Sequence, residues 1–427
     1  MRRRPRGGFW LAALAACLAL PPLVQAEETP HAGPVRAVAA LLGGAVTGGF
    51  DYTLKRWSLD PLTATATWRG HFAPVTALAV APGTVWSGDQ TGRLLARDPA
   101  SGRVRLDLKA HGDAVTALAP APDGRIASAG RDGGLAVWTQ KGRRLAVAKA
   151  GASLLALAWA EDGALFAGGG DGGVTRWRLD GGALRGTPFI PAGGMPVVGL
   201  AFGTGLLVLR TNGRLEAYGP NGRPAAGIQA HEAAATALAV DALGDAAVTA
   251  DAGGTAVLWR LPGPVPLRAR AVTGDPVWSA AFLPDGGVLL GGMDGRVRVW
   301  RPEADAVLAS AAMPEEAAGT GEGARLFRRC AVCHDLERAA SPKPGPSFHG
   351  LLGRHAGSLP AYDYSPALRG SRIVWTGAAL DRLLAEGPER FVPGSRMPLQ
   401  RMGDAGERAA LIAYLRRATA TDGNPTP

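Results

Sequence analysis

A pattern of about 40 residues, recurring from His31 to about Ala312, constrains the fold of this chain more than any other feature. An aromatic residue, or an arginine in its place, stands near the end of each period, and successive positions are 39 to 41 residues apart. These positions are Trp57, Arg97, Trp138, Trp177, Tyr218, Trp259 and Trp300. Seven periods of this length predict a repeat architecture in which each unit buries its apolar face against the next.

Each period has room for four short strands. In the third period, apolar stretches at 114–119, 125–129, 134–138 and 144–148 are separated by turn residues. Asp123-Gly124 and Asp132-Gly133 are dipeptides that favour tight turns between antiparallel strands. Neighbouring periods repeat this plan, so we expect seven four-stranded sheets.

The repeats also share polar positions. Histidines stand at the start of four periods, at His31, His71, His111 and His231. Asp51, Asp132, Asp171, Asn212 and Asp294 each lie six residues before the aromatic position. With these features the segment resembles the WD-repeat family of β-propellers.

That resemblance implies a seven-bladed all-β propeller over residues 27–313, in which each histidine, turn Asp and Trp form a buried hydrogen-bond network. These residues are therefore expected to be structural, and the propeller to serve as a platform for a protein partner. Residues 306–311 can supply the fourth strand of blade 7. We expect the ring to close by side-chain packing between blades 1 and 7, without strand exchange, because only a few residues lie between Ala26, where a signal segment is expected to end, and His31.

Further along the chain, Cys330-Ala331-Val332-Cys333-His334 places two thiols three residues apart with a histidine directly after them. This spacing is typical of the attachment site of a c-type haem. On a helix, positions i, i+3 and i+4 share one face, so both sulfurs can form thioethers while the His334 imidazole reaches the iron. We expect one covalent haem c here.

Two cysteines at this spacing also occur in structural zinc sites and in redox-active dithiols. A structural zinc site needs four Cys or His ligands, and the one remaining cysteine, Cys17, lies in an N-terminal apolar segment. A thioredoxin-like dithiol opens the helix of a βαβ unit, and no such unit surrounds these residues. The spacing therefore favours haem.

The segment around this motif differs from the repeats. Residues 314–321 lose the strand pattern and predict a short linker to a domain over 322–427. One helix is expected from about Glu322 through Cys333, and a closing helix over 405–418. The second domain is therefore expected to be all-α.

At its later motifs this domain resembles class I cytochrome c of the mitochondrial and bacterial c2 type. The matching stretches are Gly345-Pro346, His349-Gly350-Leu351, Gly353-Arg354, Tyr362-Asp363-Tyr364-Ser365, Trp375, Pro393-Gly394 with Met397, Glu407-Arg408 and Ala413-Tyr414-Leu415. The resemblance implies His334 and Met397 as axial ligands of the iron, a pairing that raises the reduction potential. Met402 is the rival sulfur, but it lacks the Pro-Gly loop.

The same resemblance implies further roles. The carbonyl beside the Pro346 position accepts a hydrogen bond from the His334 ring, and Arg354, Tyr364 and Trp375 bind a haem propionate. Leu368 stands where the family often has Asn, and Leu383 where a Tyr commonly bonds the methionine sulfur. These two departures are expected to move the potential or loosen the Met–iron bond.

The N-terminus has the pattern of a secretion signal over residues 1–26. Arg2, Arg3, Arg4 and Arg6 precede an apolar core, and a small-residue site ends at Ala26. We expect cleavage there and a periplasmic location. The alternative is a lipid anchor on Cys17, within a stretch that resembles a lipoprotein box.

The charge is unevenly distributed. The chain has a formal net charge of +10, and residues 317–427 carry 15 Lys+Arg against 10 Asp+Glu. No basic run is interleaved with aromatics, so nucleic-acid binding is not expected. Arg354, Arg369, Arg372, Arg390, Arg396 and Arg401 cluster in sequence around the Met397 loop. They are either a solvated basic face or a patch, beside an exposed haem edge, that steers an acidic redox partner.

Three functions remain open at this point. The leading hypothesis is an exported c-type cytochrome that carries single electrons, with the propeller docking a partner, rather than an enzyme. The alternative is a periplasmic oxidoreductase whose propeller binds substrate or a cofactor and passes electrons to the fused cytochrome. The third is a scaffold whose binding depends on haem redox state. Fold alone does not decide among them.

Overall fold

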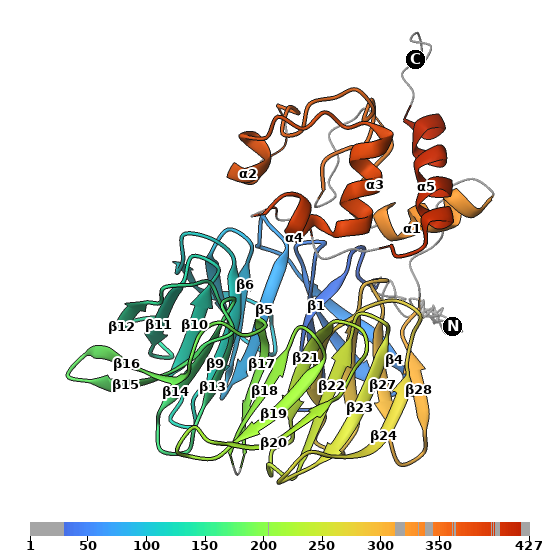
Figure 1. The fold of residues 1–427 in the computed structure, drawn as a ribbon. Helices are drawn as coiled ribbons and strands as arrows, with labels where there is room; N and C mark the ends of the chain where they lie inside the picture. The colour runs from blue at the N-terminus through green and yellow to red at the C-terminus, as the bar shows by residue number, and fades with distance from the viewer. Residues whose placement is uncertain are drawn as a thin grey trace, which may run out of the picture.

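The computed structural model describes residues 30–203, 205–311, 321–331, 333–337, 345–360, 362, 364–393, 395, 397 and 402–419. The expected signal segment with Cys17, the linker except Gly321, and Arg396 and Arg401 lie outside the described residues. Two parts are present, a strand-rich part and a helical part (Figure 1). The expectation of a propeller followed by a small helical domain is confirmed.

The strand-rich part is a propeller of seven four-stranded sheets, each built from four consecutive strands. All neighbouring strands within a blade are antiparallel, as the Asp-Gly turns predicted. Blades 1 to 4 hold β1 (Val35–Leu41), β2 (Gly44–Gly49), β3 (Leu54–Leu59), β4 (Leu62–Trp68); β5 (Val75–Ala81), β6 (Thr84–Asp89), β7 (Arg93–Arg97), β8 (Val104–Lys109); β9 (Val115–Pro120), β10 (Ile126–Gly130), β11 (Gly134–Trp138), β12 (Arg144–Lys149); β13 (Leu154–Trp159), β14 (Leu165–Gly169), β15 (Val174–Asp180), β16 (Ala183–Ile190). Blades 5 to 7 hold β17 (Val197–Phe202), β18 (Leu206–Arg210), β19 (Arg214–Tyr218), β20 (Pro224–Gln229); β21 (Ala235–Val240), β22 (Ala246–Asp251), β23 (Thr255–Arg260), β24 (Val265–Ala271); β25 (Val277–Phe282), β26 (Val288–Gly292), β27 (Val297–Arg301), β28 (Ala306–Ala309).

The ring closes between blades 1 and 7 as predicted, because β28 pairs with β27 of its own blade. Val35 and Trp57 of blade 1 pack in one apolar cluster with Leu289 and Val299 of blade 7. The Ser279 hydroxyl adds a hydrogen bond to the Val35 carbonyl. Burial of apolar side chains therefore joins the ends of the ring.

Four blades contain the buried histidine network that the repeat pattern predicted. In blade 1, His31 contacts the Asp51 carboxylate through Nδ1 at 3.0 Å and the Thr47 hydroxyl through Nε2 at 2.6 Å. Trp57 donates to the same hydroxyl at 2.7 Å. Blades 2, 3 and 6 have equivalent His–Asp pairs. These chains of bonds satisfy polar groups that packing has removed from water.

In blades 2 and 6, the acid comes from a different position than the spacing indicated. Asp89 and Asp251 bind His71 and His231, and each ends the second strand of its blade. Both stand eight residues before Arg97 and Trp259, not six. The hairpin has the same register in these blades as in blades 1 and 3, so the carboxylate comes from the end of the second strand and not from the turn that follows it.

The helical part contains α1 (Glu322–Ala331), α2 (Pro366–Arg369), α3 (Gly377–Glu386), α4 (Pro388–Phe391) and α5 (Ala405–Ala418). The closing helix has the predicted bounds, and Asp404 caps it by accepting from the Glu407 amide. The first helix ends at Ala331, two residues earlier than predicted. In the core of the helical part, Leu326 and Phe327 of α1 pack against Leu411 and Leu415 of α5.

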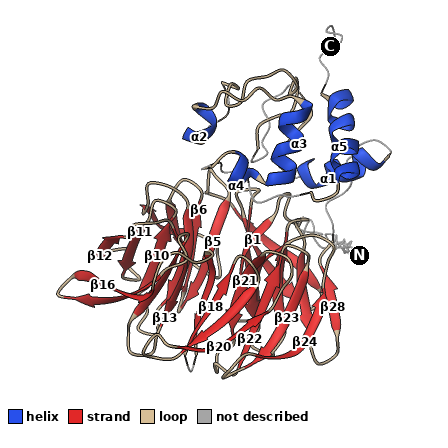
Figure 2. Ribbon diagram, in the orientation of Figure 1, coloured by secondary structure: helices blue, strands red, loops and turns tan. Residues whose placement is uncertain are grey.

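Close approach of α1 and α5 depends on Gly323. A Cβ at this position would lie 2.4 Å from the Ala410 carbonyl oxygen. The helices gather on one side of the propeller, over the loops at one end of its strands (Figure 2). Within the described part of the chain, no helix is long and apolar enough to cross a membrane.

Candidate functional site

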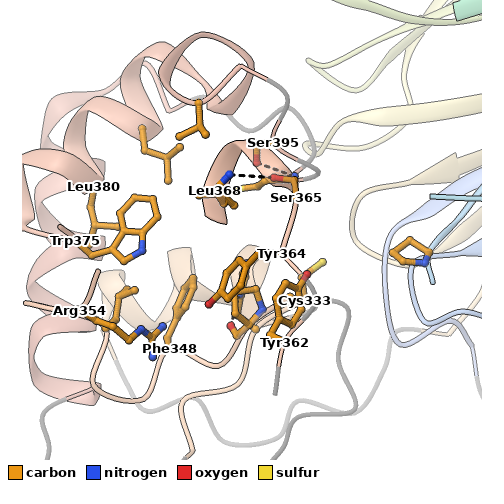
Figure 3. A pocket seen from close by; sticks show the side chains of 18 of the residues that line it. Cys333, Phe348, Arg354, Tyr362, Tyr364, Ser365, Leu368, Trp375, Leu380 and Ser395 are labelled. Carbon is orange, nitrogen blue, oxygen red and sulfur yellow. Dashed lines mark hydrogen bonds between the residues drawn. The ribbon is translucent and has the colours of Figure 1, made fainter. Parts of the chain in front are cut away.

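A cleft in the helical part opens toward the propeller (Figure 3). Its empty volume, including the open mouth, is about 940 Å³, which is within the range of cofactor sites. Seven of the eight residues singled out in the sequence line it: Cys333, His334, Pro346, Arg354, Tyr364, Trp375 and Met397. The eighth, Cys330, is buried beside it in the helical core. Segments far apart in the chain therefore converge on one cavity.

The end of α1 places the two cysteines and the histidine. The backbone amides of Cys333 and His334 both donate to the Cys330 carbonyl, at 3.0 and 2.8 Å. This tight turn follows directly on Ala331, so the three side chains remain close even though the helix has ended. Cys330 is 8% exposed and Cys333 5%.

The imidazole of His334 is oriented by two neighbours. Its Nδ1 lies 2.7 Å from the Pro346 carbonyl oxygen, and because a carbonyl only accepts, Nδ1 carries the proton. The ring of Phe348 stacks on it, with centroids 4.0 Å apart and planes 20° from parallel. This tautomer leaves Nε2 as the nitrogen with a lone pair, the form that ligates metals.

The two candidate sulfurs lie in different places. Met397 lines the cleft, and its amide donates to the Ser395 hydroxyl at 3.1 Å. Met402 is 8% exposed and packs in the helical core, where its amide donates to the Leu384 carbonyl. Of these two methionines, only Met397 is among the described residues that line the cleft.

Arg354 and Trp375 form the end of the cleft far from the propeller (Figure 3). A short backbone ladder holds them together, since the Trp375 amide donates to the Arg354 carbonyl at 2.9 Å. The Arg354 guanidinium donates to the carbonyls of His349 and Ser347, both at 2.7 Å. Burial lowers the pKa of Arg354 below its ordinary value, and the nearby Tyr364 offsets part of this effect.

Known proteins match both parts of the chain. The family model described as WD domain, G-beta repeat, matches residues 102–139 and 268–301. Over 100 residues the chain is 40% identical to cytochrome c of Sesamum indicum, covering 23% of this chain and 88% of that protein. It is 39% identical over 105 residues to cytochrome c type-1 of Ascaris suum, covering 24% of this chain and 92% of that protein.

Through its helical part, the chain belongs to the cytochrome c family. Its propeller consists of WD40 repeats. A crystal structure of the computationally designed Ika8 protein is also similar, with a TM-score of 0.51 and 26% identity, covering 62% of this chain and 83% of that one. Membership in this family implies a covalently bound haem c and an electron-transfer function.

The cleft of this cytochrome fits such a group. Arg354 Nε is buried and has no hydrogen-bond partner among the described atoms, so it is suited to a carboxylate placed beside it. Tyr364 supplies a hydroxyl nearby, and burial raises the pKa of that hydroxyl. A haem propionate would satisfy the orphaned donor, while apolar side chains such as Leu380 and Trp375 line the cavity for the ring.

Sequence reasoning missed several residues of the site. Phe348 stands between the quoted motifs, and nothing in the sequence signals its stacking on His334. Phe50, Pro74 and Gln90 of the propeller also line the cleft. No local pattern could identify them, because they belong to the other part of the chain. Leu368 and Leu383, the two departures from the family pattern, both face the cleft.

The arginines of the predicted basic patch differ in their surroundings. Arg354 points into the helical part, and Arg369 donates to the Tyr364 carbonyl at 2.8 Å. The Arg354 guanidinium is therefore held inside the helical part, whereas Arg369 is exposed and keeps its positive charge at the surface. Arg372 and Arg390 are exposed, whereas Arg396 and Arg401 lie outside the described residues.

Proposed function

We propose that this protein is an exported electron carrier with a single haem c, in which His334 and Met397 ligate the iron and Cys330 and Cys333 hold the porphyrin. The observation that carries the proposal is the convergence of Cys333, His334 and Met397 on one cleft, with Cys330 buried directly beside it. When bound, the haem supplies a one-electron couple between ferrous and ferric iron. The chain then determines how that couple is held and tuned.

Each of these side chains has a definite part. Pro346 and Phe348 keep the His334 ring in one orientation and one tautomer. Arg354, Tyr364 and Trp375 hold the propionate end, where an unpaired buried carboxylate would be costly. Leu380 and Leu383 exclude water, and a dry site with a thioether ligand favours the ferrous state.

Export and partners complete the proposal. The Arg-rich start, the apolar core and the Ala26 site support removal of residues 1–26 and function in the periplasm. The excess of basic residues over 317–427 supports an acidic redox partner. WD40 repeats suggest that the propeller engages proteins, and we assign it a docking role.

The ligand assignment is tested by two leucine variants of the haem-loaded full-length protein. Met397→Leu removes the thioether from the cleft, so ferrous protein should bind carbon monoxide and its reduction potential should fall. Met402→Leu is the matched control, because the same change in the helical core costs less than about 1.5 kcal/mol. Carbon monoxide binding to Met402→Leu and not to Met397→Leu would reverse the assignment.

Haem stoichiometry and export need separate measurements. Iron and haem per chain should each equal one, and both cysteines should resist alkylation. The mass of the mature protein should correspond to a start at Glu27. A mass that corresponds to a lipid-modified chain beginning at Cys17 would show that the protein is anchored to a membrane instead.

A further inference from the structure

The propeller touches the helical part at the site of the predicted thioether. Cys333 belongs to a buried cluster with Phe50, Trp278 and Met293, which are 4%, 6% and 3% exposed. Phe50 and Trp278 contact each other at 5.8 Å between ring centroids. Phe50 follows β2 of blade 1, and the other two come from blade 7. The two ends of the ring thus meet beneath Cys333.

Other residues at the same end of the propeller extend this contact. Pro74 and Gln90 of blade 2 line the cleft itself. Arg131 Nη1, in the turn after β10, donates to the Ser395 carbonyl at 3.2 Å, two residues before Met397. Tyr52, in the turn after β2 of blade 1, is also removed from water at this end, and burial is the main cause that raises its pKa to about 12. Together with the Cys333 cluster, these contacts bring blades 1, 2, 3 and 7 against the helical part around its cleft.

The contact with the propeller lies at one end of the cleft. Cys333 and Tyr362 lie at the end that faces the propeller, whereas Arg354 and Trp375 lie at the opposite end (Figure 3). A haem attached at Cys333 would turn its thioether edge toward the loops of the propeller.

We propose that the loop end of blades 1, 2, 3 and 7 is the docking surface for the haem domain of the same chain, and that this contact keeps redox partners from the thioether edge. The inference rests on the proposed function, since it needs haem at Cys333. A partner reaches this edge when the haem domain leaves the propeller. The propeller is then a competitor for the partner's site.

The contact between the propeller and the haem domain has the composition of a reversible interface. Among the described residues it includes a small apolar cluster and the Arg131 bond, and no ion pair between these residues joins the two parts. Interfaces of this kind between domains of one chain resemble transient complexes. Because the propeller is tethered to the haem domain, it nevertheless competes with an external redox partner at a high effective concentration, on the order of millimolar for short linkers.

The contact between the propeller and the haem domain differs in charge from the docking of an acidic redox partner. Several carboxylates at this end are already paired within the propeller: Asp51 with His31, Asp89 with His71, Asp132 with His111 and Asp294 with Arg298. Arg36 and Arg131 give this face positive charge, and Arg36 is held by the Trp278 carbonyl at 2.8 Å. The internal contact should therefore depend weakly on salt, whereas docking of an acidic partner on the basic haem domain should weaken as salt rises.

The test uses the haem-loaded full-length protein and two small oxidants of opposite charge, ferricyanide and tris(phenanthroline)cobalt(III). One electron passes from the ferrous protein to each oxidant, and the rate is followed by absorbance. Phe50→Ala and Met293→Ala weaken the apolar cluster, and Arg131→Gln removes the polar contact from an exposed side chain whose loss leaves the fold intact. Leu42→Ala is the control, because Leu42 is 99% exposed in the β1–β2 turn.

Hydrogen exchange of the peptide over residues 49–53 gives a second readout that does not depend on electron transfer. We expect the three contact variants to speed oxidation by both reagents, up to about tenfold for the apolar ones, which corresponds to ~1.4 kcal/mol. Exchange over 49–53 should rise by a similar factor. Leu42→Ala should match the wild type.

The outcomes are distinguishable. Unchanged rates and exchange in all three variants, with an intact low-spin haem spectrum, would overturn the docking surface and leave the proposed function standing. A rise with only one oxidant would reveal an effect of charge and would also overturn it. A wild-type protein without a His/Met haem spectrum would overturn the proposed function, and this inference with it.

Discussion

Gly345 lies so close to the imidazole of His334 that an added Cβ would be 2.5 Å from Cε1 of the ring. It would also be 2.7 Å from the Cys333 carbonyl oxygen. The missing side chain therefore makes room for the ring in the orientation that Pro346 and Phe348 hold. Four predictions follow from this and related contacts.

Gly345→Ala should displace the His334 ring and lower haem retention, because the neighbouring backbone leaves no space for a methyl group. Haem per chain and the low-spin absorbance spectrum measure the effect. Gly403→Ala is the matched control, since nothing lies within 4 Å of a Cβ there. Equal haem content in the two variants would contradict the role of Gly345.

Arg354→Lys should destabilise the haem-loaded protein by about 1–3 kcal/mol, because a lysine cannot bond two carbonyls and a carboxylate with one planar fork. Denaturant unfolding followed by haem absorbance gives the free energy. Arg372→Lys, at an exposed position, should leave it unchanged. If both variants unfold alike, Arg354 does not hold a buried carboxylate.

Asp251→Ala should lower the free energy of unfolding of the propeller by about 2–4 kcal/mol, because it leaves the buried His231 ring without its acceptor. It also removes the bonds from the Gly253 and Thr255 amides. Asp245→Ala, in an exposed turn of the same blade, should have an effect within about 0.5 kcal/mol. Circular dichroism during urea unfolding compares them.

Acid should weaken blade 1 in a defined pH window. Burial alone would raise the pKa of Asp51, but the charge and hydrogen bonds of His31, with bonds from Thr53, lower it to about 2. Because the folded-state pKa is below the unfolded value, the stabilisation is present above pH 4 and lost as pH falls toward 2. The loss is on the order of 2 kcal/mol.

Unfolding between pH 5 and pH 2 measures this loss, and Asp51→Asn should flatten the corresponding part of the curve. Asp245→Asn is the control, and it should leave the pH dependence as it is in the wild type. A wild-type slope in Asp51→Asn would show that other carboxylates account for the acid sensitivity.

Much of the architecture could be predicted from spacing. The 39–41-residue period gave seven blades, and α5 has the predicted bounds. These features are local, because strand alternation, turn dipeptides and helix caps act within a few residues. Blade closure without strand exchange was also predictable, since the chain after Trp300 could supply the last strand.

The sequence by itself determined that this chain forms a seven-bladed ring followed by a cytochrome domain with one Cys-x-x-Cys-His motif, because residue order and spacing encode both. The tertiary structure alone decided that Asp89 and Asp251 bind their histidines, and that Phe348 stacks on His334. It alone placed Phe50, Trp278 and Met293 against Cys333. These contacts join residues distant in the chain, and packing between separately formed units selects them where local spacing cannot.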